Sequence, residues 1–182
     1  MGASAQSQDV DSRYPIGRFQ RPDTISQQDR TNAIAAIAGM PGLLKAAVDG
    51  LDREQLDTPY RDGGWTVRQT VHHYPDSHMN GFVRLRLALT EDTPTIKLYD
   101  EKAWAMLRDC TSAPVGWSLD LIENLHARWV LLLDSLSEEQ WARSMNHPEN
   151  GLISIEMHTQ LYAWHSKHHV AHITRLREQK GW

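Results

Sequence analysis

Residues 114–136 read PVGWSLDLIENLHARWVLLLDSL, and this stretch decides the fold class. Its apolar residues recur every three or four positions, which places them on one broad face of a helix: Leu119, Leu121, Ile122, Leu125, Trp129, Leu132 and Leu133. A helix with such a face must bury it against other elements. The spacing therefore predicts a long core helix over residues 114–136.

Three other stretches have helical patterns, at residues 24–51, 66–89 and 154–178. A proline inside a helix removes a hydrogen bond, so we expect Pro41 to break or kink the first of them and Pro75 to bend the second. Few segments alternate with period two, and the apolar pair at 152–153 is too short to predict a sheet. Four long helices predict an all-α four-helix bundle.

Short signals mark the connections. Thr66 with Gln69, and Ser137 with Gln140, have the form of capping boxes, and Asp52 is placed to cap a short turn. Residues 91–100 are expected to be irregular. The polar residues 1–13 predict a flexible N-terminus, residues 14–22 an ordered arm, and residues 14–182 as a whole a single four-helix-bundle domain.

Composition excludes several classes of function. The chain has 182 residues, of which 40% are hydrophobic and 23% charged, and a net charge of −4. These values are typical of a globular domain with a real core. Nucleic acid binding is not expected without a basic face, and neither a bilayer-spanning stretch nor a signal peptide is apparent. The lone Cys110 can form no intramolecular disulfide and is expected to be inert. Because disulfides are rare in the reducing cytoplasm, a cytoplasmic location is expected.

The histidines are the candidate metal ligands of this sequence. Six of the ten histidines lie in two clusters, 72–78 and 165–169, and His172 follows closely. In the second cluster His165 with His169, and His168 with His172, are each four residues apart and share one helix face. Such an i,i+4 pair is a common helical metal clamp, because both imidazoles can reach one ion. The pattern predicts a site for one divalent metal ion.

A third ligand would come from the helix over residues 66–89. Its candidates are His72, His73 and His78, and the helical pattern alone does not choose between them. His126, His147 and His158 have no paired spacing and are expected to be structural, as a lone buried histidine usually is. The tryptophans, including Trp65 and Trp164, are expected to belong to the core.

The sequence resembles the DinB-like superfamily, and within it the YfiT-type group described as metal-dependent hydrolases. The resemblance is carried by five stretches: YPIGRFQ, GGWTVRQTVHHYPDSHMN, LRLALTEDTPTIKLYDEKAW, SLDLIENLHARWVLLLDSL and LYAWHSKHHVAHI. They span nearly the whole chain from residue 14. The resemblance implies an up-down-down-up bundle, often a homodimer.

The resemblance also implies three histidine ligands, which fall on His73, His165 and His169, with His72 as the alternative to His73. Tyr74 and Pro75 depart from the family pattern after the histidine pair, where an aliphatic-alanine step is expected. The implied ion is zinc or nickel, zinc being the first expectation.

Three functions fit such an ion. In a hydrolase acting on a small molecule, the ion would activate a bound water, with Asp76 as the expected base. In a thiol S-transferase, it would ionise a low-molecular-weight thiol of the bacillithiol type before attack on an electrophile. In a non-enzymatic protein, a fourth side chain such as His78, His168 or His172 would close the site.

Overall fold

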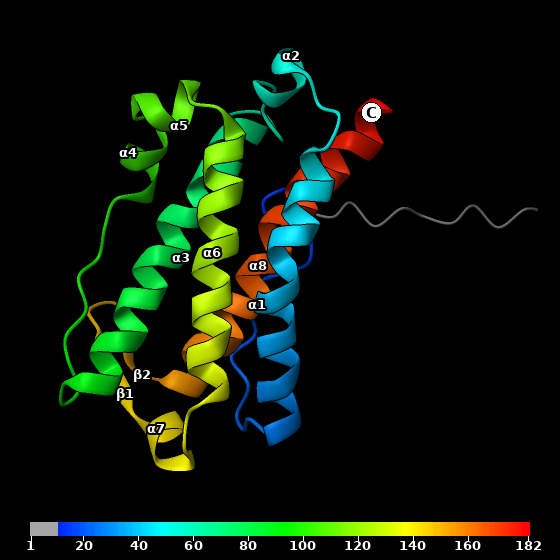
Figure 1. Ribbon diagram of the computed structural model, residues 1–182. Helices are drawn as coiled ribbons and strands as arrows, with labels where there is room; N and C mark the ends of the chain where they lie inside the picture. Colours follow the sequence, from blue (N-terminus) through cyan, green and yellow to red (C-terminus); the bar gives the residue numbers. More distant parts are fainter. Residues whose placement is uncertain (1–10) are drawn as a thin grey trace, which may run out of the picture.

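Four long helices form the body of the protein in the computed structural model, which describes residues 11–182 (Figure 1). They are α1 (Gln27–Val48), α3 (Val67–Thr90), α6 (Val115–Asp134) and α8 (Ile155–Lys180). Helices α1 and α8 run in one direction, and α3 and α6 in the other (Figure 1). The up-down-down-up four-helix bundle is therefore confirmed. Most of the predicted flexible segment, residues 1–10 of 1–13, lies outside the described residues.

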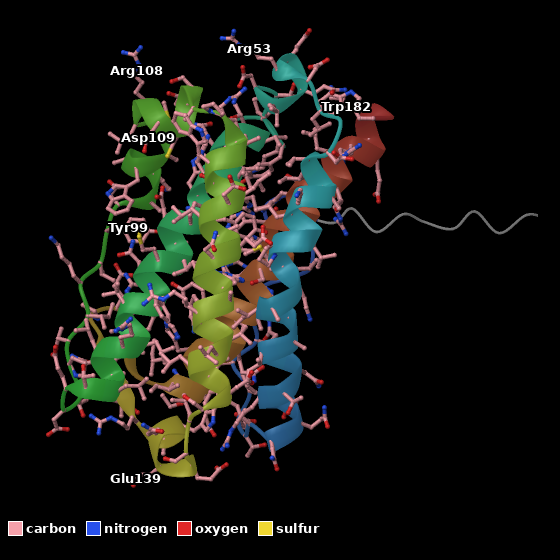
Figure 2. All side chains as sticks on the ribbon, in the orientation of Figure 1. Arg53, Tyr99, Arg108, Asp109, Glu139 and Trp182 are labelled. Carbon is pink, nitrogen blue, oxygen red and sulfur yellow. The ribbon has the colours of Figure 1, made fainter. Side chains whose placement is uncertain are left out.

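The parallel pair α3 and α6 requires a connection that returns along the length of the bundle. The irregular residues 91–100 provide it, followed by α4 (Glu101–Ala105) and α5 (Arg108–Ser112). Helix α2 (Arg53–Leu56) lies at the same end as α5, whereas α7 (Glu138–Ala142) lies at the opposite end (Figure 1). Charged side chains project into solvent at both ends, as Arg108 and Glu139 do in Figure 2.

The predicted caps start the helices where the sequence places them. The Thr66 hydroxyl accepts a hydrogen bond from the Gln69 N–H at 3.1 Å, and the Gln69 side chain accepts one from the Thr66 N–H at 2.9 Å. Ser137 and Gln140 form the same reciprocal pair at the start of α7. These pairs satisfy backbone donors that a helix start leaves free.

Two features of the backbone differ from what the sequence indicates. Pro41 does not break the first helix, because α1 continues as one helix from Gln27 to Val48; Pro75 lies inside α3, which is also continuous. No sheet was expected, but residues 144–154 form a hairpin of β1 (Ser144–His147) and β2 (Gly151–Ser154). A hairpin this short depends on packing: Met145 and Ile153 pair across it and are both buried in the core.

The apolar core is divided into two clusters along the bundle. One contains Leu85 and Trp129 near the α7 end, and the other contains Leu44 and Tyr74 near the α2 end. Between them, the long helices contribute buried or half-buried histidines in place of apolar residues: His73 and His78 from α3, His126 from α6, and His165 from α8. The histidines therefore form a polar layer across the middle of the bundle.

Helix α1 has 22 residues and contains an 18-residue window with a mean hydropathy of 1.3, so it has the length and apolarity of a membrane span, which was not expected from the sequence. In the structure it packs against α6 and α8 as part of the bundle. Its inward face is buried: Ala33, Ile37, Met40, Leu44, Ala47 and Val48. A core helix of a globular bundle passes the same test of length and composition.

Candidate metal centre

Helix α8 presents the predicted i,i+4 pair to the interior of the protein. His165 is half-buried and His169 is buried, and their ring centroids lie 4.6 Å apart. One helical turn separates them, which is why the two rings lie side by side. The pair is thus set by the local geometry of α8 and oriented by the packing of that helix.

His73 of α3 completes a cluster with this pair. Its Nε2 atom lies 3.4 Å from the Nε2 atom of His165, and its ring centroid lies 4.9 Å from that of His169. One ring nitrogen from each of the three lies within 4.8 Å of the others. Two nitrogens that share one tetrahedral zinc ion at ~2.0–2.1 Å are roughly 3.3 Å apart, so the His73–His165 spacing fits a common ion.

Burial keeps these imidazoles neutral. It lowers the pKa of His73 to about 4 and lowers the pKa values of His165 and His169 well below the usual range. Neutral imidazole carries the lone pair that a metal ion needs. The three side chains therefore have the spacing and the protonation state that fit a divalent metal ion at near-neutral pH.

The cluster lies in the wall of a pocket of about 670 Å³. Aromatic rings also line it: Trp65 lies 4.7 Å from the ring of His73, and Trp164 is stacked on His168 at 4.5 Å. Both tryptophans were expected to belong to the core, and their place in the pocket wall was not predicted. Trp65 stands directly before the cap of α3, and Trp164 directly before His165, so their proximity in sequence to the clusters was the available signal.

The other two histidines of α3, His72 and His78, have both ring nitrogens engaged in hydrogen bonds. His72 uses both ring nitrogens on α5 and α6, with the Ala113 carbonyl at 3.2 Å and the Ser118 hydroxyl at 2.7 Å. His78 also uses both of its nitrogens, one on His126 and one on His165. Neither histidine has a free lone pair directed at the pocket, so the structure favours His73 as the third member of the cluster.

His168 and His172 form a second histidine group on α8. Their Nε2 atoms lie 3.2 Å apart, and with His169 they make another set of three whose nitrogens approach one another. Because His169 belongs to both sets, the two sets would compete for it. Only the set with His73 joins two helices.

Asp76, the expected base, does not line the pocket. Its carboxylate accepts a hydrogen bond from the Cys110 thiol at 3.6 Å, and burial raises its pKa. Burial also raises the pKa of Cys110 to about 12, so the thiol is protonated and unreactive, as expected. The carboxylate that does line the pocket is Glu101, at the start of α4.

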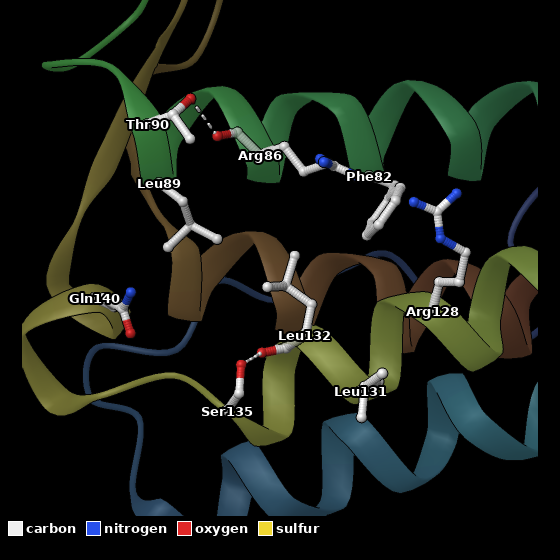
Figure 3. A pocket seen from close by; sticks show the side chains of 9 residues that line it. All are labelled: Phe82, Arg86, Leu89, Thr90, Arg128, Leu131, Leu132, Ser135 and Gln140. Carbon is white, nitrogen blue, oxygen red and sulfur yellow. Dashed lines mark hydrogen bonds between the residues drawn. The ribbon is translucent and has the colours of Figure 1, made fainter.

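Another pocket, of about 580 Å³, lies between α3 and α6 toward α7 (Figure 3). Arg86 and Arg128 both lie over the ring of Phe82 there, at 5.5 and 5.7 Å from its centroid. Its lining contains no histidine, cysteine or carboxylate. It therefore offers none of the ligands that a metal-dependent reaction needs.

Comparison with known proteins agrees with this geometry. Residues 36–173 match the family model described as the DinB superfamily. The chain belongs to the DinB superfamily. "Putative metal-dependent hydrolase YfiT" of Bacillus subtilis strain 168 is 48% identical over 174 residues, which cover 95% of this chain and 98% of YfiT. A DinB-superfamily relative from Oceanobacillus iheyensis, "Putative metal-dependent hydrolase OB0782", is 51% identical over 173 residues, 95% of this chain and all of the relative.

A solved structure extends the likeness to three dimensions. This DinB-superfamily chain matches the structure reported under the words "YfiT from Bacillus subtilis is a probable metal-dependent hydrolase with an unusual four-helix bundle topology". The TM-score is 0.92 at 48% identity, over 95% of this chain and 99% of the other. The parallel α3 and α6 in the middle of the order are what distinguish this bundle from one with alternating helices (Figure 1).

Proposed function

We propose that this protein is a metal-dependent hydrolase of small molecules, with His73, His165 and His169 as the ligands of one divalent ion, zinc or nickel. The observation that carries the proposal is the 3.4 Å approach of two neutral imidazole nitrogens from different helices in the wall of a pocket. Relatives named as metal-dependent hydrolases support it. Zinc is the first expectation, and an all-imidazole ligand set suits nickel as well.

An open coordination position favours an enzyme over a structural site. His78 has both nitrogens occupied, and His168 and His172 contact each other, so no fourth side chain is directed at the cluster from these positions. The three rings instead border a pocket. A divalent ion held there would lower the pKa of a bound water and polarise a carbonyl group.

The pocket wall indicates how a substrate would be held. Arg61 and Lys102 line it, and neither forms an ion pair among residues 11–182. These cations favour a substrate with an acidic group, and the rings of Trp65 and Trp164 favour a flat or apolar remainder. We assign the role of general base to Glu101 rather than Asp76, because Glu101 borders the pocket.

The test is elemental analysis of the purified protein beside His73→Ala, His165→Ala and His169→Ala. About one ion per chain in the wild type, and loss of most of it in each variant, is the expected result. His147→Ala is the matched control, because this histidine lies in the hairpin and belongs neither to the histidine cluster nor to the lining of its pocket. Variants that keep their metal would show that the site is wrong.

A substrate screen with the reconstituted protein separates the reaction classes. Acidic esters and amides should be hydrolysed without added thiol. Turnover of an electrophile that depends on a low-molecular-weight thiol would instead identify a thiol transferase, and would overturn the hydrolase assignment while leaving the metal site in place.

A further inference from the structure

A row of buried hydrogen bonds crosses the bundle and ends at the proposed metal ligand His165. The Nδ1 atom of His126 lies 2.6 Å from the Ile37 carbonyl oxygen, and its Nε2 atom lies 2.8 Å from Nδ1 of His78. The Nε2 atom of His78 then lies 3.0 Å from Nδ1 of His165. Each of the four long helices contributes one member to this row, which we call the histidine row: Ile37, His126, His78 and His165.

The start of the row is explained by the proline inside α1. In an α-helix the carbonyl of residue 37 accepts a hydrogen bond from the N–H of residue 41. That residue is Pro41, which has no N–H, so the Ile37 carbonyl is left without its helical partner. His126 donates to that carbonyl instead, so the proline leaves a buried acceptor that a neighbouring helix satisfies.

This carbonyl fixes the tautomer of every imidazole in the row. A carbonyl oxygen only accepts, so the His126 proton is on Nδ1 and its Nε2 carries the lone pair. That lone pair accepts a hydrogen bond from the Nδ1–H of His78, whose Nε2 in turn accepts one from the Nδ1–H of His165. Burial keeps these rings neutral: His78 and His126 are 0% and 1% exposed, and no carboxylate is hydrogen bonded to either. The Nε2 atom of His165 is therefore left with a lone pair.

That lone pair faces the metal centre. The Nε2 atom of His165 is the atom that lies 3.4 Å from Nε2 of His73. Of the three proposed ligands, His165 is the one whose second nitrogen is hydrogen bonded among the described residues, whereas the buried Nδ1 of His169 has no partner there. An imidazole ligand whose other nitrogen is anchored has a fixed tautomer and ring orientation.

We propose that His78 and His126 are positioning residues, which hold His165 in the Nδ1–H tautomer and present its Nε2 lone pair to the ion. This inference rests on the proposed function for its metal ion. The hydrogen-bond row itself exists without the ion, so the tautomer can be tested in metal-free protein, and a failure of one proposal can be told from a failure of the other.

The first experiment is a long-range ¹H–¹⁵N correlation spectrum of metal-free protein labelled with ¹⁵N-histidine, with rings assigned from single variants. We expect protonated Nδ1 and unprotonated Nε2 at all three histidines, His126, His78 and His165. A protonated Nε2 at His165 as the main form would overturn the proposal. This outcome does not depend on whether the wild type binds metal.

The second experiment titrates zinc against a competing chelator in His126→Phe and His126→Gln. The Phe variant keeps an aromatic ring at this position but offers His78 no acceptor, so we expect a 10–100-fold loss of zinc affinity. The Gln variant places an amide oxygen where His78 can donate to it, so we expect an affinity close to that of the wild type. His158→Phe is the matched control, because neither nitrogen of that buried imidazole has a hydrogen-bond partner among residues 11–182, and His158 lies outside the row.

Each result decides the proposal. A folded Phe variant with wild-type affinity, or a Gln variant as weak as the Phe variant, would show that the row does not position His165. If the Phe variant does not fold, the Gln variant and the spectrum of the wild type decide in its place. A wild type that binds no zinc or nickel would refute the proposed function, and the spectrum would still report the tautomer.

Discussion

Gly81 of α3 lies directly against the ring of Tyr162 from α8, so closely that a Cβ atom at position 81 would overlap the ring. The Tyr162 hydroxyl donates a hydrogen bond to the Ser77 carbonyl of α3 at 3.1 Å. This contact holds the helix that carries His73 against the helix that carries His165. The distance between the two halves of the candidate metal centre therefore depends on the missing side chain at position 81.

Gly81→Ala should separate the two helices. Because Tyr162 is buried, its ring cannot move into solvent, and we expect a loss of ~1–3 kcal/mol in the free energy of unfolding, together with weaker zinc binding. Denaturant unfolding and a zinc titration measure the two effects. Gly39→Ala in α1 is the control: a Cβ there meets no atom within 4 Å, so alanine should stabilise by about 0.5–1 kcal/mol.

His72→Ala and His73→Ala should differ in kind. His72 joins α3 to Ser118 of α6 and to the Ala113 carbonyl, so its loss leaves buried polar groups unpaired and should cost ~1–3 kcal/mol of stability with little change in metal content. His73→Ala should lose the metal. Metal analysis beside thermal unfolding of both variants checks this, and metal loss in His72→Ala alone would reverse the assignment of the α3 ligand.

His158 should make the protein sensitive to acid. Burial lowers its folded pKa to about 3, below the value of ~6.5 in an unfolded chain, so the unfolded state binds more protons between these two values. Stability is then full above about pH 6.5 and falls as the pH drops, by up to about 1.4 kcal/mol per pH unit for this one group. His158→Phe should show a shallower decline between pH 6.5 and pH 4 in denaturant unfolding. An unchanged slope would mean that His158 does not stay neutral in the folded protein.

Glu101→Gln should reduce turnover of a hydrolysable substrate by about 10²–10⁴-fold while leaving the metal bound, because a general base is lost and no ligand is. Asp76→Asn should have a much smaller effect, since Asp76 contacts Cys110 outside the pocket. Steady-state kinetics at matched metal content distinguishes the two. A larger loss of turnover in Asp76→Asn would return the role of base to the residue expected from the sequence.

The structural features that depend on residues close together in the sequence were predicted best. The capping boxes at Thr66 and Ser137 start helices as expected, and the His165–His169 pair shares a helix face, because each depends on contacts between residues three or four apart. Residues 114–136 were also correctly assigned to a core helix, with Ile122, Trp129 and Leu133 buried, although Leu121 of the predicted apolar face is exposed. These features need no knowledge of the rest of the fold.

Features that depend on distant partners could not be predicted. A break of the first helix at Pro41 was one of the expectations, but packing on both sides of the proline stabilises α1 enough for it to continue from Gln27 to Val48. The hairpin at residues 144–154 was missed because its strands are four residues each and are stabilised by burying Met145 and Ile153. Propensity carries little information at that length.

The sequence by itself determined the helices, their order and the pair of histidines on α8, since these follow from periodicity and capping along the chain. Only the tertiary structure decided that His73 of α3 approaches both His165 and His169, whereas His78 contacts the other ring nitrogen of His165. It also decided that His126 lies within reach of the carbonyl freed by Pro41. The physical reason is that a ring nitrogen is placed to within a few tenths of an ångström by the packing of α3, α6 and α8 together, and no spacing within one helix records how the others pack against it.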